Sequence, residues 1–392
     1  MIRRAIQRAM LCLAVLSSAF AGGAALSQTT SADGYETRAR EAILIDARTG
    51  RVLFEKDADK LIAPASMSKL MTMVMVFEAL EAGKLSLDQQ FKVSEDAWRR
   101  GGAMSGGSTM YAELNSSVRL EDLIKGVVVQ SANDACIVIA ENMAGSEVAF
   151  ASRMTERARE LGAATASFRN ATGLPETGHV MSVRDLSVMA RHIVTSFPKY
   201  YGYYAIPEFT WNGIRQQNRN PLLKDYPGAD GMKTGYTKEA GYGLVGSAIR
   251  DGRRLIMVIA GLNSINERRQ EAQSLLDWGF RQFRSIDVYA KGDRVGQARV
   301  WGGRGRHVDL LADAPVKVAL TAQEQASADI KLVYKGPLLA PVTAGTEVGA
   351  VRFVVDGVTV AEVPVSTASA VEADRSMWSR ALDSLFIMAF GS

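Results

Sequence analysis

The residue pattern changes at about residue 284, and this change most strongly limits the possible fold. Residues 41–283 combine strand-like segments with long amphipathic helical segments. Residues 285–367 contain only short β-branched runs, separated by Gly, Asp and Pro. A length of 392 residues also exceeds that of one ordinary core. We therefore predict two domains, a mixed α+β domain over 28–284 and a small all-β domain over 285–370.

The order of elements in the first domain indicates a single sheet with helices packed on it. A hairpin pattern comes first, three helical patterns follow, and two buried strands and a fourth helix complete the domain. The segments are a hairpin at 42–55, helices after Pro64, at 120–129 and at 133–143, strands at 244–248 and 255–260, and a helix at 269–280. In the second domain, Asp356-Gly357 between two alternating segments predicts a two-residue hairpin turn.

Residues 1–27 have the pattern of a secretory signal peptide. A start that contains Arg3, Arg4 and Arg8 precedes an apolar run, and small residues near Ala21 and Ser27 suit signal peptidase. The alternative is an uncleaved anchor helix, which the short run with its Gly and Ser residues disfavours. We expect export, with cleavage at one of these two positions.

The remaining composition argues against several classes of site. The leader arginines account for most of the formal charge of +4, so no basic surface for nucleic acid is indicated. Cys12 lies in the leader and Cys136 is alone, so we expect no internal disulfide and interpret Cys136 as a buried, inert thiol. The chain has 3 histidines, too few to favour a Ser-His-Asp triad or a zinc site. We therefore expect no metal or organic cofactor.

Residues 371–392 form an amphipathic helical pattern. Trp378, Leu382, Leu385 and Phe386 share one face, and charged residues lie off it. The segment is too short and too mixed to span a bilayer. It could pack on its own protein, but Trp and Phe on the apolar side favour binding to a membrane surface. We expect peripheral anchoring.

Ser66 and Lys69 stand three residues apart at the start of the helix expected after Pro64. This spacing places both side chains on one helix face, one turn apart, so the amine can reach the hydroxyl. A buried lysine near a second cation is driven toward its neutral form and can accept the serine proton. The pair alone is a weak signal, because a helix cap followed by an exposed lysine has the same spacing.

Two further triplets strengthen this interpretation. Ser131-Ala132-Asn133 stands at the joint between two predicted helices, and Lys233-Thr234-Gly235 precedes a predicted strand. Ser-x-x-Lys followed by these triplets is the motif set of penicillin-binding proteins and class A β-lactamases. With their neighbours, over 64–72, 131–136 and 230–237, the motifs resemble those of the D-alanyl-D-alanine carboxypeptidases among the low-molecular-mass penicillin-binding proteins.

The resemblance implies a β-lactamase/transpeptidase-like catalytic domain, in which helices pack on an antiparallel sheet. A β-rich domain and an amphipathic C-terminal helix follow in that family. The implied reaction removes the terminal D-alanine from peptidoglycan pentapeptide stems through an acyl-enzyme, and β-lactam antibiotics are implied covalent inhibitors. The implied location is the periplasmic face of the bacterial inner membrane.

The resemblance also implies catalytic roles for three residues. Ser66 would be the nucleophile and Lys69 its base. Ser131 would relay a proton to the amine of the departing D-alanine, and Asn133 would bind the amide backbone of the substrate. These roles give an acyl-transfer mechanism that needs no histidine.

Four residues on the third motif would bind the substrate. Lys233 would supply positive charge and Thr234 a hydroxyl for the terminal carboxylate, while Gly235 would let the strand approach the ligand closely. The backbone N–H groups of Ser66 and Tyr236 would form the oxyanion hole. Family members often have histidine in place of Tyr236. Because the expected contact is from the main chain, we predict that this difference alters substrate preference more than chemistry.

Arg219 and Arg268 match places where the family has arginines near the bound carboxylate. Arg269 adjoins the second of them and makes that assignment ambiguous. Exposed arginines with no role are the other interpretation. The sequence leaves both open.

Three alternative functions use the same motifs. A class A β-lactamase would need a Glu-x-x-Leu-Asn segment after the middle motif, and neither Glu113 nor Glu176 stands in one, so we predict slow release of bound β-lactam. A D,D-endopeptidase would use the same residues and is disfavoured only by the β-rich domain and terminal helix. A non-catalytic scaffold that binds peptidoglycan is disfavoured because every residue needed for chemistry is present.

Overall fold

The computed structural model describes residues 35–374. The chain divides between Phe283 and Arg284 into two compact units, at the position where the residue pattern changes. The predicted signal peptide lies outside the described residues. In the part of the chain that is described, no helix combines the length and apolar character needed to cross a bilayer.

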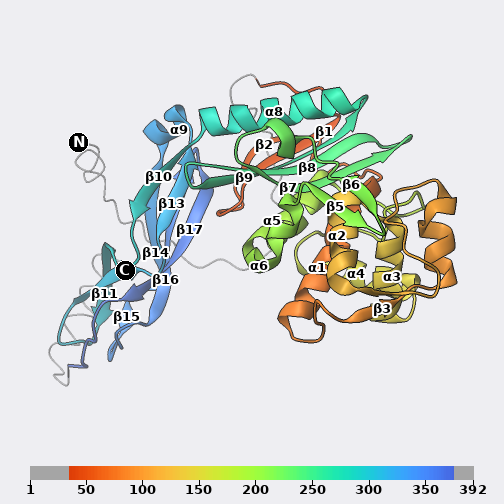
Figure 1. Cartoon of the computed structure of the whole chain (residues 1–392). Helices are drawn as coiled ribbons and strands as arrows, with labels where there is room; N and C mark the ends of the chain where they lie inside the picture. The colour runs from red at the N-terminus through yellow and green to blue at the C-terminus, as the bar shows by residue number, and fades with distance from the viewer. Residues whose placement is uncertain (1–34, 375–392) are drawn as a thin grey trace. The chain divides into compact units, whose positions relative to one another are not determined.

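The first unit is built on a five-stranded antiparallel sheet with the order β2-β1-β9-β8-β7 (Figure 1). The predicted first hairpin and the two buried strands are part of it. Its strands are β1 (Glu41–Asp46), β2 (Val52–Lys56), β7 (Ala229–Thr237), β8 (Gly241–Arg250) and β9 (Arg253–Leu262). The sheet is thus formed by segments from both ends of the unit, as the element order predicted.

Helices cover both faces of this sheet. Successive side chains of a strand point to opposite sides, so one strand can pack against helices on both faces. Leu44 on β1 packs against Gly279 of helix α8 (Ile265–Gln282), where a Cβ would lie 2.4 Å from its side chain. Its neighbours Ile43 and Ile45 belong to the large core on the other face, with helix α5 (Val183–Ser196). Figure 1 shows α8 and α5 on opposite sides of the sheet. This two-sided burial explains the continuous apolar runs of the central strands.

The helical part of the unit surrounds helix α1. A 3-10 turn (Ala65–Ser68) leads into α1 (Lys69–Glu81), which is buried on nearly all sides, and Gly83 follows with a positive φ of 65°, as the predicted helix end requires. The other helices are α2 (Leu120–Lys125), continued by a π-helical turn (Gly126–Gln130), α3 (Asn133–Ala144), α4 (Glu147–Glu160), α6 (Pro198–Tyr201) and α7 (Leu222–Asp225).

Smaller elements complete the first unit. Two short hairpins pair β3 with β4 and β5 with β6. Their bounds, with those of the remaining π-helical and 3-10 turns, are β3 (Gln90–Lys92), β4 (Ser117–Arg119), β5 (Glu208–Trp211), β6 (Ile214–Gln217), and turns at Ala97–Gly101, Ala103–Ser105 and Gly202–Ala205.

The second unit consists mainly of β-strands around its own apolar core. A six-stranded sheet has the order β14-β16-β17-β12-β11-β15, and β10 pairs with β13. Asp356 and Gly357 join β16 and β17 with positive φ angles of 48° and 84°, the conformation that the predicted hairpin turn needs. The strands are β10 (Arg284–Tyr289), β11 (Arg294–Trp301), β12 (His307–Ala312), β13 (Val316–Leu320), β14 (Asp329–Tyr334), β15 (Leu338–Leu339), β16 (Glu347–Val355) and β17 (Val358–Thr367).

Two details of the second unit differ from the sequence prediction. A short helix, α9 (Ala322–Ser327), was not predicted, although Thr321 and Glu324 form the reciprocal capping box that begins it. Val371 is buried and forms a β-bridge with Val342, and Ala373 also forms a bridge. The predicted helix over 371–392 is therefore wrong for its first four residues, and the rest of it lies outside the described residues.

Candidate active site

Lys69 holds Ser66 at the junction between the 3-10 turn and α1. The Nζ atom of Lys69 donates to Ser66 Oγ at 2.9 Å and to Asn133 Oδ1 at 2.8 Å, and it also donates to the Thr172 carbonyl. The lysine side chain has 0% exposure. Three oxygen acceptors satisfy the three N–H bonds of an ammonium group, so the amine is fixed in one position. The predicted contact between amine and hydroxyl is present.

Lys233 on β7 makes a second lysine–serine pair. Its Nζ atom donates to Ser131 Oγ at 2.9 Å and to the Thr234 carbonyl at 3.0 Å. Ser131 stands just before α3 with a φ of 66°, a left-handed conformation that non-glycine residues seldom adopt. The two pairs come from segments far apart in the sequence, and the sheet and α3 bring them together. Four predicted residues thus form two hydrogen-bonded pairs, Ser66 with Lys69 and Ser131 with Lys233.

Burial disfavours the charged form of both lysines. Loss of solvent lowers the pKa of Lys69 to about 8, and the positive charge of Arg219 adds to this shift. Burial also lowers the pKa of Lys233 well below its usual range, and the charge of Lys69 lowers it further. An amine with a pKa near 8 is partly neutral at physiological pH and can act as a base.

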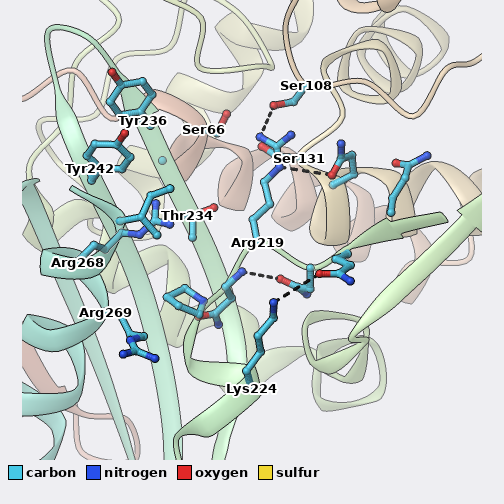
Figure 2. A pocket seen from close by; sticks show the side chains of 18 of the residues that line it. Ser66, Ser108, Ser131, Arg219, Lys224, Thr234, Tyr236, Tyr242, Arg268 and Arg269 are labelled. Atoms are coloured by element: carbon cyan, nitrogen blue, oxygen red, sulfur yellow. Dashed lines mark hydrogen bonds between the residues drawn. The ribbon is translucent and has the colours of Figure 1, made fainter. Parts of the chain in front are cut away.

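A cavity of about 840 Å³ opens in front of the two serines. Ser66 and Ser131 line it together with Thr234, Gly235 and Tyr236 (Figure 2). The predicted residues that do not line it are the two lysines and Asn133, all at most 4% exposed. They lie behind the serines, and Asn133, which we expected to bind the amide backbone of the substrate, accepts a hydrogen bond from Lys69 through its side-chain oxygen.

Gly235 is needed for a contact that the sequence did not indicate. A Cβ atom at this position would lie 2.9 Å from Met67 Cγ and 3.0 Å from the Pro64 carbonyl oxygen. Strand β7 therefore packs directly against the turn that carries Ser66. Glycine is therefore needed here for the contact with the turn that carries Ser66, as well as for the predicted approach of the ligand.

The structure resolves the ambiguity about the arginines. Arg219 lines the cavity and donates from Nη1 to Ser108 Oγ at 2.6 Å. Arg268 also lines it with only 6% exposure, and its guanidinium lies 5.6 Å from the centre of the Tyr242 ring. Arg269 lies farther along the same cavity and forms an ion pair with Asp225 at 2.6 Å. The interpretation as exposed arginines is therefore wrong for Arg268, whereas Arg219 is exposed but lines the cavity.

Several cavity residues were not predicted. Ser108, Tyr111 and Gln130 line the cavity. Tyr242 stacks on Tyr236 with ring centres 4.2 Å apart (Figure 2). No motif marks these positions, because they come from separate turns and strands.

Asp134, next to Asn133 of the second motif, gives an indirect signal for two of these residues, Ser108 and Tyr111. Its buried carboxylate accepts bonds from Thr109 Oγ1 at 2.7 Å and from the backbone N–H groups of Met110 and Ala112 at 3.0 Å each. It thereby fixes the segment that carries Ser108 and Tyr111. A buried acid next to a catalytic motif could have pointed to this segment.

Cys136 is buried on α3, as predicted. Burial raises the pKa of its thiol to about 12, so the sulfur stays protonated and weakly reactive. It contributes a neutral, apolar neighbour to the two lysines.

Comparisons with known proteins find the same family that the sequence motifs resemble. Residues 27–264 match the family model of D-alanyl-D-alanine carboxypeptidase, and residues 283–373 match that of the penicillin-binding protein 5 C-terminal domain. D-alanyl-D-alanine carboxypeptidase DacF of Bacillus subtilis is 36% identical over 334 residues, which is 84% of each chain.

Two solved structures are also similar. Penicillin-binding protein 5 from Haemophilus influenzae superimposes with a TM-score of 0.79 at 31% identity, over 87% of this chain and 99% of the other. Penicillin-binding protein D2 from Listeria monocytogenes, in its ampicillin-bound form, gives 0.55 at 28% identity, over 63% and 99% of the two chains. The protein studied here belongs to the D-alanyl-D-alanine carboxypeptidase family of penicillin-binding serine peptidases.

Proposed function

We propose that the protein removes the terminal D-alanine from the pentapeptide stems of peptidoglycan through an acyl-enzyme on Ser66. The observation that carries this proposal is the position of Ser66 Oγ, which lies 2.9 Å from the Nζ atom of fully buried Lys69 while Ser66 lines the cavity. A hydroxyl with a buried amine behind it and open space in front is arranged for nucleophilic attack.

In the first step, neutral Lys69 takes the Ser66 proton as Oγ attacks the carbonyl carbon of the penultimate D-alanine. The backbone N–H groups of Ser66 and Tyr236 would stabilise the oxyanion. Ser131 then passes a proton to the leaving amine, the C–N bond breaks, and D-alanine departs. The contact between Ser131 Oγ and Lys233 Nζ supports this role, because the N–H that Lys233 donates would stabilise the serine oxygen as its proton leaves.

Recognition of a free carboxylate would select the C-terminal residue of the stem. Thr234, Arg219 and Arg268 line the same cavity as Ser66. Burial lowers the pKa of Arg268 to about 10, so it remains charged at neutral pH without a carboxylate partner among the described residues. Its Nε also has no hydrogen-bond partner among them. A substrate carboxylate would satisfy this buried cation.

Hydrolysis of the acyl-enzyme completes the reaction, and it should be slow for a bound β-lactam. Neither Glu113 nor Glu176 is among the described residues that line the cavity. Glu113 accepts a bond from Asn212 and Glu176 one from Asn170, so both belong to other local structures. Asp225 is the one carboxylate among the described residues that line the cavity, and it is paired with Arg269 at 2.6 Å.

A D,D-endopeptidase remains a second candidate on the same residues. The cavity continues from Arg219 and Arg268 to Lys224 and Arg269 (Figure 2). A leaving group longer than D-alanine would find space and positive charge there. Incubation with a pentapeptide and with a cross-linked dimer of stem peptides, followed by chromatography of the products, would separate the two activities.

We further propose that the protein is exported and acts at the periplasmic face of the inner membrane, where its last residues bind the membrane surface. The leader and the amphipathic pattern of the C-terminal sequence support this location. A chain that ends at Asp374 should no longer sediment with vesicles of anionic phospholipid, whereas the longer chain should do so.

The main test is intact-mass spectrometry after incubation with benzylpenicillin, with Ser66→Ala beside the parent protein. A stable adduct of one penicillin that is absent from the variant would establish acylation at Ser66. An unmodified parent protein with intact drug would contradict the proposed function, and an unmodified protein with hydrolysed drug would indicate a β-lactamase.

A further inference from the structure

A buried carboxylate with no assigned role is connected to Lys69 through one backbone segment. Glu147, in the first turn of α4, is 7% exposed. Its Oε1 accepts the backbone N–H of Ala171 at 2.9 Å, and its Oε2 pairs with Arg100 at 2.8 Å. The carbonyl of the following residue, Thr172, accepts from Lys69 Nζ. Glu147 is thus connected to the catalytic amine through the backbone of two residues, Ala171 and Thr172, and one hydrogen bond at each end.

The segment 171–173 also packs directly behind the nucleophile. Gly173 has a φ of 77°, and a Cβ there would lie 2.0 Å from the Ala65 carbonyl oxygen. Thr72 Oγ1 donates to the Ala171 carbonyl at 2.8 Å. Any displacement of this segment would therefore move an acceptor of Lys69 and the wall against which the Ser66 turn rests.

We propose that Glu147 is a positioning residue for acylation: it holds the 171–173 segment so that the Thr172 carbonyl fixes Lys69 against Ser66. The inference rests on the proposed function and adds to it a residue outside the three motifs. Arg100 neutralises part of the Glu147 charge and keeps the carboxylate turned toward the segment, since its guanidinium is itself held by Asp96 at 2.8 Å.

Glu147 has a second, electrostatic effect on Lys69. The charged and titratable groups around this amine are the cations Lys233 and Arg219, the carboxylates Asp134 and Glu147, and the thiol of Cys136. Asp134 already accepts four bonds that fix another segment. Loss of the Glu147 charge would lower the pKa of Lys69 further, because one of the two negative charges that favour the ammonium form would be absent.

Two substitutions separate the geometric effect from the electrostatic one. Glu147→Gln keeps an oxygen that can accept the Ala171 N–H but removes the charge. Glu147→Asp keeps the charge but shortens the side chain by one methylene, so it loses reach to Ala171. Glu41→Gln is a matched control, because Glu41 is 3% exposed and pairs with Lys60 at 2.8 Å but is not among the groups that act on Lys69.

The measurement is the second-order rate of benzylpenicillin acylation between pH 5 and 10, with thermal unfolding of each variant. Glu147→Asp should lower the plateau rate by about 10- to 100-fold without moving the acidic limb. Glu147→Gln should shift the rising, acidic part of the pH–rate profile to lower pH, so that its acylation rate at pH 6 is a larger fraction of its plateau rate. Glu41→Gln should change neither the plateau nor the position of the profile.

Three outcomes decide the matter. A folded Glu147→Asp protein with the parent plateau would overturn the positioning role, and this variant suffices if Glu147→Gln does not fold. A plateau lowered equally by Glu41→Gln would reduce the effect to general loss of stability and would also overturn it. If the parent protein itself is not acylated, the proposed function fails instead, which distinguishes that failure from this one.

Discussion

Lys69 Nζ lies 2.9 Å from Ser66 Oγ, although the lysine has no exposed surface. The amine is therefore both close enough to take the serine proton and buried enough to give up its own. Because the pKa of Lys69 is lowered to about 8, acylation should increase with pH up to about 8 and then level off. Stopped-flow measurement of benzylpenicillin acylation between pH 5 and 10 tests this. A rate independent of pH across 6–8 would exclude Lys69 as the titrating base.

Removal of the Ser131 hydroxyl should slow catalysis more than it changes binding. Ser131→Ala leaves Lys233 in place but removes the oxygen 2.9 Å from its amine, so the leaving group would have to depart without a proton donor. We expect kcat for D-alanine release to fall about 100-fold or more, with a small change in KM. Ser152→Ala, at an exposed position on α4, supplies the control. An equal loss in both variants would contradict the relay role.

Arg268 should distinguish a C-terminal carboxylate from an amide. Arg268→Gln should lower kcat/KM for a pentapeptide acid by about 10- to 100-fold, because hydrogen bonds to a charged partner contribute about 1.5–3 kcal/mol. The same peptide with a C-terminal carboxamide should be affected much less. Arg269→Gln is the neighbouring control, since that side chain pairs with Asp225. Parallel losses on both peptides would indicate a structural effect.

Gly235→Ala tests the packing of β7 against the nucleophile turn. The added Cβ would lie 2.9 Å from Met67 Cγ and 3.0 Å from the Pro64 carbonyl oxygen, so the strand or the turn must move. Overpacking of this kind should lower the free energy of unfolding by about 1–3 kcal/mol and should also slow acylation. Gly202→Ala has no heavy atom within 4 Å of the added Cβ and serves as the control. Chemical denaturation and penicillin acylation give the two readouts.

Local features of the site could be predicted from the sequence, and long-range ones could not. The contact between Ser66 and Lys69 follows from helical spacing alone. The contact between Ser131 and Lys233 joins residues 102 positions apart, so spacing could not indicate it, and the resemblance to a family implied only that both residues belong to the site. Spacing also could not separate Arg268 from Arg269, because adjacent helix residues point about 100° apart and the packing of α8 decides which of them is buried.

The same distinction holds for the fold. Four strands of the five-stranded sheet were predictable because their apolar patterns are distinct, whereas β7, with the sequence around Lys233-Thr234-Gly235, has no apolar run. Helix α9 was missed because its six residues are too few to show a period, although its capping box was visible. Glu147 gave no signal at all, since a glutamate early in an amphipathic helix is most often exposed, and its partners Ala171 and Arg100 are distant in the sequence.

The buried lysines should also make stability depend on pH. In the unfolded chain Lys69 has its ordinary pKa of 10.5, whereas in the folded protein it is about 8, so between these values the unfolded state binds more protons. The free energy of unfolding should therefore rise with pH from about 8 to 10.5, and Lys233 contributes in the same direction. Below pH 8 the cost of burying Lys69 is constant, on the order of 3 kcal/mol.

Lys69→Met should make the free energy of unfolding rise less with pH, because methionine does not titrate. The variant also lacks the positive charge of Lys69, so the pKa of Lys233 should move back toward its usual range. Urea unfolding of the parent and the variant at pH 7, 8, 9 and 10 measures the difference, and groups that titrate equally in both proteins cancel. Lys84→Met, at an exposed position after α1, gives the reference curve. Parallel curves for the parent and Lys69→Met would mean that Lys69 is not held with a lowered pKa, and its role as a neutral base would then lose its physical basis.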